Sequence, residues 1–276
     1  MKNTQTRRAS ILTAAVLTAV AFTVASTTVA SAGEREDTES VAAVAASLEG
    51  VRDLDPTLIL PPVAGAGEAA IDGLLSVGSG AVEVPRVPEV GVELVGWAGE
   101  PVTVGLPFAD EAQHAVGLAD GAVVFTGLDS SSTVVVGESG VQMLTTIADE
   151  AAPTRYSYDL HLAPGQTMSL AGDGVHVLNS DDSIAIVISS AWAKDAKGVD
   201  IPTAFEVEGT TLTQVVSHTA ADASYPVVAD PIFIAPWVFR CLLGLGLNGP
   251  QITAAFASGT IWGGLGRAAL ACALGR

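Results

Sequence analysis

The residues best suited to acid–base chemistry are four histidines, and their spacing argues against a catalytic or metal site. No two of them stand three or four residues apart, as a metal-binding pair on one helix would, and no Gly-x-Ser-x-Gly motif supplies a nucleophile. A site would need His161 and His176 to meet on neighbouring strands, with Asp159 or Asp173 completing it. We favour the alternative that both histidines lie on solvated faces of a sheet, because the neighbours that share a face with His161 are polar. We therefore predict no catalytic residue, and a secreted hydrolase is the least favoured class of function. The histidines are His114, His161, His176 and His218.

Oxygen-bearing side chains gather in the segment Asn179-Ser180-Asp181-Asp182-Ser183. This segment lacks the glycine and the distal glutamate of a calcium-binding loop. We interpret it as a plain turn, and we expect neither a metal nor any other cofactor.

The last 46 residues, 231–276, differ in charge from the rest of the chain. They contain both cysteines and three arginines but no acidic residue, a net charge of +3, whereas residues 33–230 carry six basic and thirty acidic residues, a net charge of −24. A body this acidic, without a basic stripe, excludes nucleic acid as a partner. It suits solubility outside the cell.

The amino terminus resembles a secretory signal. Basic residues precede the apolar run Ile11–Ala25, and Ala30-Ser31-Ala32 forms a small-x-small cleavage pattern, so residues 1–32 are the predicted signal peptide and cleavage is expected between Ala32 and Gly33. The general secretory route is favoured over the twin-arginine route because Ser10 occupies a position where a large apolar residue is expected. In an exported protein two cysteines usually pair, which predicts a disulfide between Cys241 and Cys272.

Hydrophobic periodicity divides the mature chain into three regions. Residues 33–87 are expected to form a short amphipathic helix, which Gly50 ends, followed by a connector rich in proline, glycine and alanine. Residues 88–230 alternate apolar and polar side chains over about ten short segments separated by turn sequences. This pattern predicts a mainly β protein with an antiparallel β-sandwich or jelly-roll-like domain. The expected strands are 90–95, 102–106, 122–126, 133–136, 141–147, 156–162, 174–178, 184–189, 204–208 and 212–217.

Residues 231–276 are predicted to be helical and apolar. One helix is expected from Pro236 to Leu247, followed by a turn at Asn248-Gly249-Pro250. Two straight helices would leave Cys272 about 22 Å beyond its partner, at about 1.5 Å of rise per residue. If the cysteines pair, a break at Gly263-Gly264 and three short helical pieces are required.

The tail admits two interpretations. Gly259 and Gly263 are four residues apart in an apolar segment, and the tail's three arginines would favour an anionic membrane surface, so residues 231–276 could be membrane-active. The alternative is a small-residue helical element that packs on the sandwich, with its arginines paired to the acidic surface. A membrane-spanning tail is disfavoured because Gly249-Pro250 and one arginine interrupt the apolar run. The arginines are Arg240, Arg267 and Arg276.

The segments Ala191-Trp192-Ala193-Lys194-Asp195-Ala196-Lys197-Gly198 and Tyr225-Pro226-Val227-Val228-Ala229-Asp230-Pro231 carry a resemblance. The region around them, residues 156–231, resembles uncharacterised exported actinobacterial proteins with a β-rich domain and an apolar, two-cysteine C-terminal tail. The resemblance implies export and modularity but no catalytic residue. It also implies that Asp230 and Pro231 form a hinge between the β domain and the tail.

These observations together predict a secreted, non-enzymatic protein whose β domain presents or shields a cationic apolar tail. The tail could act on an anionic membrane after proteolytic release. The alternative function is a structural or protein-interaction module of the cell envelope with a permanently docked tail.

Overall fold

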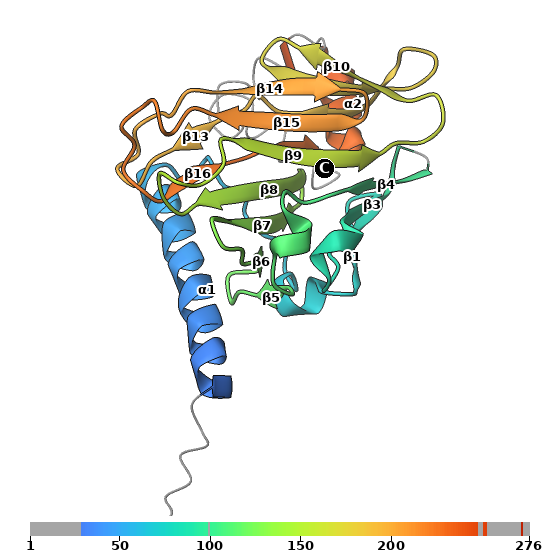
Figure 1. Ribbon diagram of the computed structural model, residues 1–276. Helices are drawn as coiled ribbons and strands as arrows, with labels where there is room; N and C mark the ends of the chain where they lie inside the picture. Colours follow the sequence, from blue (N-terminus) through green and yellow to red (C-terminus); the bar gives the residue numbers. More distant parts are fainter. Residues whose placement is uncertain (1–28, 99, 248–250, 253–271, 273–276) are drawn as a thin grey trace, which may run out of the picture.

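The computed structural model of the chain describes residues 29–98, 100–247, 251–252 and 272. Two antiparallel sheets pack face to face and share one apolar core, as the alternating pattern predicted (Figure 1). The first has seven strands in the order β1-β2-β3-β4-β9-β15-β14. Their bounds are β1 Leu74–Val77, β2 Gly80–Glu83, β3 Val92–Ala98, β4 Glu100–Val104, β9 Arg155–His161, β15 Thr211–Val216 and β14 Thr203–Glu208.

The second sheet has ten strands, of which eight follow the order β10-β11-β12-β17-β8-β7-β6-β5. The other two form a side branch in which β13 pairs with β16 and β16 pairs with β8. The bounds are β5 Val116–Gly117, β6 Val123–Phe125, β7 Ser130–Gly137, β8 Gly140–Ile147, β10 Thr167–Ala171, β11 Gly174–Leu178, β12 Ile184–Ile188, β13 Ala193–Lys194, β16 Val227–Ala229 and β17 Ile232–Ile234.

Strand β9 shows how the sequence pattern produces the sandwich. Tyr156, Tyr158 and Leu160 are buried between the sheets, and the residues that alternate with them are exposed. Strand β8, by contrast, is buried along its whole length. The side chain of Gln142 on β8 accepts a hydrogen bond from Leu60 N (2.8 Å) and donates one to Leu58 O (2.8 Å), so an N-terminal segment covers that strand.

Helix α1, Val29–Leu54, packs on one end of the sandwich through Val44, Leu48 and Val51. The prediction that Gly50 ends this helix is wrong, because the helix continues to Leu54. Pro56 disfavours helical backbone in the residue before it, and the Asp55 carboxylate accepts a hydrogen bond from Thr57 N (2.9 Å). The helix begins upstream of the cleavage point expected between Ala32 and Gly33, and that cleavage stays a prediction.

The predicted irregular connector before residue 88 is wrong in its second half. Strands β1 and β2 form a hairpin there, and β2 pairs with β3 so that Val82 lies opposite Leu94. The sequence does not predict this hairpin, because each of its strands has only four residues, too few to show a clear alternation. Three short 3₁₀ helices lie in the connections of this half of the chain, at Gly67–Ala70 (η1), Pro88–Val90 (η2) and Ala109–Glu111 (η3).

The predicted hinge between Asp230 and Pro231 is also wrong. These two residues connect β16 to β17, and both strands pair with β8, so the connection lies inside the larger sheet. Pro231 O accepts a hydrogen bond from Met143 N (2.9 Å), and Asp230 is fully buried. A hinge would need an exposed link with few contacts.

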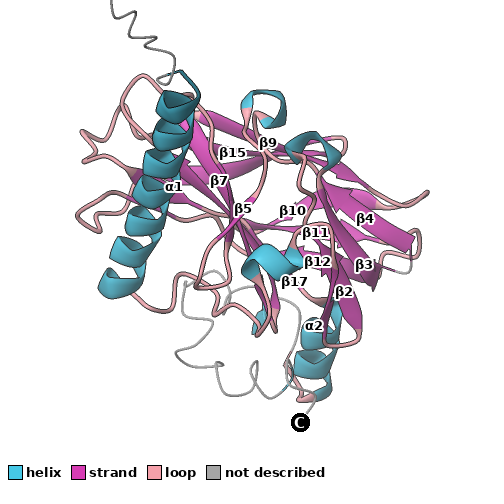
Figure 2. Cartoon of the chain, turned by 90° about the horizontal axis from the view of Figure 1, so that it is seen from below, coloured by secondary structure: helices cyan, strands magenta, loops and turns pink. Residues whose placement is uncertain are grey.

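The helix expected from Pro236 to Leu247 is present but shorter, as α2, Pro236–Gly244, with its proline in the first turn. Helices α1 and α2 lie on opposite sides of the strands (Figure 2). Within the residues that the structure describes, no helix is long and apolar enough to cross a membrane. The expected turn at Asn248-Gly249-Pro250, the break at Gly263-Gly264, and Gly259, Arg267 and Arg276 lie outside the described residues.

Candidate functional site

A polar cleft of about 480 Å³ lies on the outer face of β9. Its floor contains the four exposed side chains of that strand, and η2 and η3 contribute to its walls. The floor residues are Arg155, Ser157, Asp159 and His161.

The polar side chains of this floor bond across the sheet. Ser157 Oγ lies 3.0 Å from Thr213 Oγ1, and the Asp159 carboxylate accepts a hydrogen bond from Thr211 Oγ1 (2.6 Å). Alternate residues on one face of a strand are about 6.6 Å apart, which separates Ser157 from His161 by roughly 13 Å. Ser157 and His161 are therefore too far apart to form a hydroxyl–imidazole pair of the kind that nucleophilic catalysis needs. Thr103 of β4, which also lines the cleft, lies opposite His161 in the sheet.

Phe108 at the rim of this cleft has an unusual backbone conformation. Its φ of 51° and ψ of 38° lie in the left-handed region, which is rare for a bulky residue. Its ring packs edge-on against Tyr156, with centroids 5.9 Å apart, while 37% of the residue stays exposed. This aromatic contact offsets part of the backbone cost.

The sequence-predicted meeting of His161 and His176 does not occur. His161 lies on β9 of the seven-stranded sheet, whereas His176 lies on β11 of the ten-stranded sheet, opposite Ser169 and Val187. Partial burial lowers the pKa of His176. Asp173 occupies the turn between β10 and β11 of the ten-stranded sheet, whereas Asp159 lies on β9 of the seven-stranded sheet, and His114 is exposed. The interpretation of His161 as an outward-facing sheet residue is confirmed.

His218 is the fully buried histidine, which the sequence patterns did not single out. Its Nε2 lies 3.1 Å from Pro153 O, and its Nδ1 lies 2.7 Å from the Tyr225 hydroxyl. A carbonyl oxygen can only accept, so Nε2 carries the proton and Tyr225 donates to Nδ1. Both ring nitrogens are used to join two loops, which makes His218 a structural residue.

The segment from Asn179 to Ser183 forms the expected turn. The Asp181 carboxylate accepts hydrogen bonds from Ser183 N (3.1 Å) and Ser183 Oγ (2.6 Å), which lower its pKa. Asn179 Nδ2 donates to Ser183 Oγ (3.0 Å). These bonds engage Asp181 Oδ1 and the Ser183 hydroxyl within the turn, and Asn179 Oδ1 accepts a hydrogen bond from Gln166 Nε2 (3.0 Å). Among the described residues, no group of three or more His, Cys, Asp or Glu side chains could hold a metal ion.

Asp230 is a buried acid in the centre of the larger sheet. Burial raises the pKa of its carboxyl group well above the ordinary value, and hydrogen bonds with Trp192 and Gln142 offset only part of that rise. Trp192 N donates to Asp230 Oδ1 at 3.1 Å. The side chain that was expected to mark a hinge therefore ties the segment before β13 to the connection between β16 and β17.

The tail is attached to the body by a strand and a helix. Phe233 and Ile234 of β17 are buried, and so are Val238, Phe239 and Leu242 of α2. The predicted disulfide is present between Cys241 on α2 and Cys272, with Cα atoms 5.6 Å apart. The disulfide therefore holds Cys272 beside α2, although the two cysteines are 31 residues apart in the sequence.

The fold and these contacts define a two-sheet antiparallel β protein with an anchored C-terminal helix. No protein-family model matches the chain, and no curated protein is significantly similar to it in sequence.

Proposed function

We propose that the protein is an exported, non-enzymatic module of the cell envelope whose β-sandwich holds its C-terminal tail permanently in place. Among the functions expected from the sequence, this is the docked-tail alternative. The observation that carries it is the position of β17 between β12 and β8. Release of the segment from Pro231 to Arg276 would remove a strand from the interior of a sheet and expose Phe233 and Ile234.

Two further observations support the proposal. The disulfide between Cys241 and Cys272 fits an oxidising compartment outside the cytoplasm. In the β9 cleft, Ser157 and Asp159 bond to the neighbouring strand β15, and Arg155 pairs with Glu206 of β14. These three side chains thus bond to the sheet, which fits a non-enzymatic protein.

Limited proteolysis of the disulfide-intact protein, followed by mass spectrometry, tests the docked tail. We expect the peptide bonds from Tyr225 to Gly244 to resist cleavage, because the backbone there belongs to β16, β17 and α2. Cleavage elsewhere in the tail should leave fragments that the disulfide still joins. Rapid cutting near Asp230 that liberates the tail would contradict the proposal. The mass of the protein recovered from culture medium tests export, removal of residues 1–32 and tail retention together.

A second candidate function is contact of the attached tail with an anionic membrane. Residues 231–276 contain no acidic side chain. The disulfide joins Cys241 to Cys272 and so closes a loop within this segment. The test is co-sedimentation of the full chain with phosphatidylglycerol vesicles, compared with phosphatidylcholine vesicles. Binding that requires the anionic lipid and weakens in Arg267→Glu would support this function. Equal recovery with both kinds of vesicle would remove it.

A further inference from the structure

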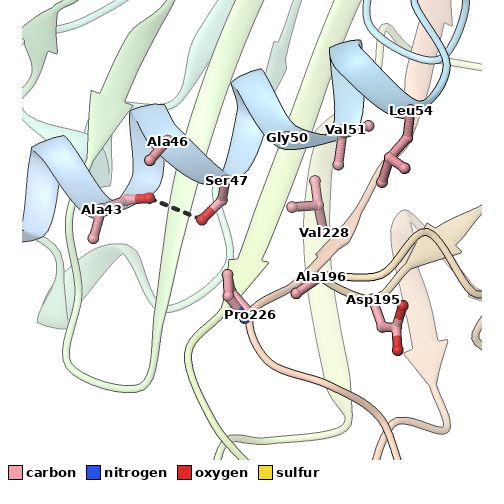
Figure 3. A pocket seen from close by; sticks show the side chains of 10 residues that line it. All are labelled: Ala43, Ala46, Ser47, Gly50, Val51, Leu54, Asp195, Ala196, Pro226 and Val228. Carbon is pink, nitrogen blue, oxygen red and sulfur yellow. Dashed lines mark hydrogen bonds between the residues drawn. The ribbon is translucent and has the colours of Figure 1, made fainter.

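An open apolar groove runs along the C-terminal half of α1 (Figure 3). It has a volume of about 380 Å³, within the range of pockets that take small ligands. We call it the α1 groove. Its lining residues are Ala43, Ala46, Ser47, Gly50, Val51 and Leu54 on the helix and Asp195, Ala196, Pro226 and Val228 opposite.

The groove is open because the helix presents small side chains to it. Val44, Leu48 and Val51 are buried and fix α1 against the sandwich. The positions beside them carry alanine, serine and glycine, which do not reach the opposite wall. A β-carbon built on Gly50 meets no atom within 4 Å, so this helix position has room for a larger side chain.

The groove has a polar end where cationic and anionic side chains meet. A second hollow of about 210 Å³ shares Val51 and Leu54 with the α1 groove and is also lined by Asp55, Lys194 and Lys197. These are the only two lysines between Val29 and Arg276, in a chain with thirty acidic residues. The α1 groove thus leads to the place where Lys194 and Lys197 lie together.

The acidic residues at this end are hydrogen-bonded within the fold. The Asp55 carboxylate accepts hydrogen bonds from Thr57 N (2.9 Å) and Thr57 Oγ1 (2.6 Å). The Asp195 carboxylate accepts hydrogen bonds from Val199 N (2.8 Å), Lys197 N (2.9 Å) and Ser224 N (3.1 Å). Burial alone would raise the pKa of Asp195, but these bonds and the nearby charge of Lys197 hold it below the ordinary value.

The two lysines differ in how they are used. The Lys194 ammonium pairs with Asp200 (2.7 Å), so the exposed ammonium of Lys197 is the cation best placed to meet a ligand.

One large apolar side chain stands exposed where the two hollows meet. Leu54 lines both of them and is 54% exposed. It lies against Gly198, where a β-carbon would be 3.0 Å from Leu54 Cδ1. A hydrocarbon chain in the α1 groove would cover Leu54 and gain the free energy of burying that surface.

We propose that the α1 groove binds an anionic amphiphile with a single acyl chain, with the chain along Ala43, Ala46 and Gly50 and the carboxylate at Lys197. Lys197 favours this occupant over a neutral hydrocarbon, which would gain nothing from its charge. The carboxylates at this end are already engaged, those of Asp55 and Asp195 in hydrogen bonds and that of Asp200 in the ion pair with Lys194. This inference concerns a different face from the anchored tail and does not rest on the function proposed above.

The test uses the purified full chain, with its disulfide intact, and cis-parinaric acid as a fluorescent fatty-acid probe. We expect saturable binding of one probe molecule per chain and weaker binding of its methyl ester. Gly50→Leu should weaken binding of the acid by roughly tenfold, since the new side chain occupies the groove. Lys197→Glu should weaken it by roughly fivefold, through loss of the charge pair and added repulsion.

Two matched variants localise the site. Ala42→Leu makes a similar change on the exposed surface of α1 outside the groove, and Arg240→Glu makes the same charge change on α2. Both should bind the probe like the wild-type chain. The proposal is overturned if the wild-type chain shows no saturable binding. It is overturned equally if Gly50→Leu and Ala42→Leu bind alike, or if the methyl ester binds as tightly as the acid.

Discussion

Trp237 of α2 packs edge-on against Trp97 of β3, with ring centroids 5.4 Å apart and ring planes at 79°. Trp97 belongs to the seven-stranded sheet, whereas β17, just before α2, belongs to the ten-stranded sheet. The start of the tail is therefore in contact with both layers of the sandwich. This double attachment explains why Asp230 and Pro231 form no hinge.

Replacing Trp237 by alanine should destabilise the protein. Loss of the aromatic contact and of buried apolar surface should lower the free energy of unfolding by about 3 kcal/mol. Urea denaturation followed by far-ultraviolet circular dichroism measures the change. Leu245→Ala serves as the control, since Leu245 is 60% exposed and should lose less than about 0.5 kcal/mol. Equal losses for the two variants would contradict the attachment through Trp237.

Gly78, in the turn between β1 and β2, should not tolerate a side chain. Its φ is +54°, and a β-carbon there would lie 2.5 Å from the Trp237 indole. Gly209 is a matched control with a φ of +59° and no atom within 4 Å of its β-carbon position. Gly209→Ala should cost about 1 kcal/mol from backbone strain alone. Gly78→Ala should cost at least about 1 kcal/mol more in the same denaturation experiment, because the tryptophan must also move.

The buried Asp230 should make stability fall as pH rises. Its pKa in the folded protein lies well above the ordinary value of 3.8, so the folded state keeps a proton that the unfolded state loses. The stabilisation is complete below pH of about 4 and is lost, at about 1.4 kcal/mol per pH unit, up to the folded-state pKa. The Asp230→Asn side chain cannot titrate, so the unfolding free energy of this variant should lack the pH dependence that the Asp230 carboxyl group causes.

The measurement for Asp230 is the difference in unfolding free energy between the variant and the wild-type chain at several pH values. That difference should move in favour of Asp230→Asn as the pH rises from 4 to 7. Asp173→Asn, at an exposed turn, controls for the loss of one negative charge. A difference that stays constant with pH would contradict the buried acid.

Removal of the His218 ring should separate the loops that it joins. His218→Ala leaves the Tyr225 hydroxyl without its partner and the Pro153 carbonyl with only its hydrogen bond from the Tyr156 hydroxyl. It should lower the unfolding free energy by about 2–4 kcal/mol. Tyr225→Phe removes only one hydrogen bond and should cost about 1 kcal/mol. Thermal unfolding monitored by circular dichroism ranks the variants. His161→Ala, at an exposed position, should unfold like the wild-type chain, and a marked loss there would contradict its surface role.

The strands of the sandwich were predictable wherever alternation extends over several residues. The expected segments coincide with β3, β4, β6–β9, β11, β12, β14 and β15. Short strands such as β16 and β17 were not predictable, because three consecutive apolar residues show no alternation. The hinge at Asp230, which the resemblance to modular exported proteins predicts, is wrong for the same reason. The three apolar residues of β17 that follow it have no alternation, so the sequence does not show that they belong to the sheet.

The candidate sites were less predictable than the fold. The outward position of His161 follows from the polar residues that alternate with it, and the disulfide follows from two cysteines in a chain with a signal-like amino terminus. The burial of His218 and Asp230 does not follow, because their partners lie 65 and 38 residues away. Long-range contacts of this kind leave no local pattern.

The sequence by itself determines the β-rich character, the acidic body, the basic tail and the pairing of Cys241 with Cys272. Only the tertiary structure decides that the tail begins as an interior strand, that His161 and His176 belong to different sheets, and that small residues of α1 border an open groove near Lys197. The physical reason is that alternation reports which face of a strand is buried, whereas the neighbours of that strand are chosen by packing over the whole core.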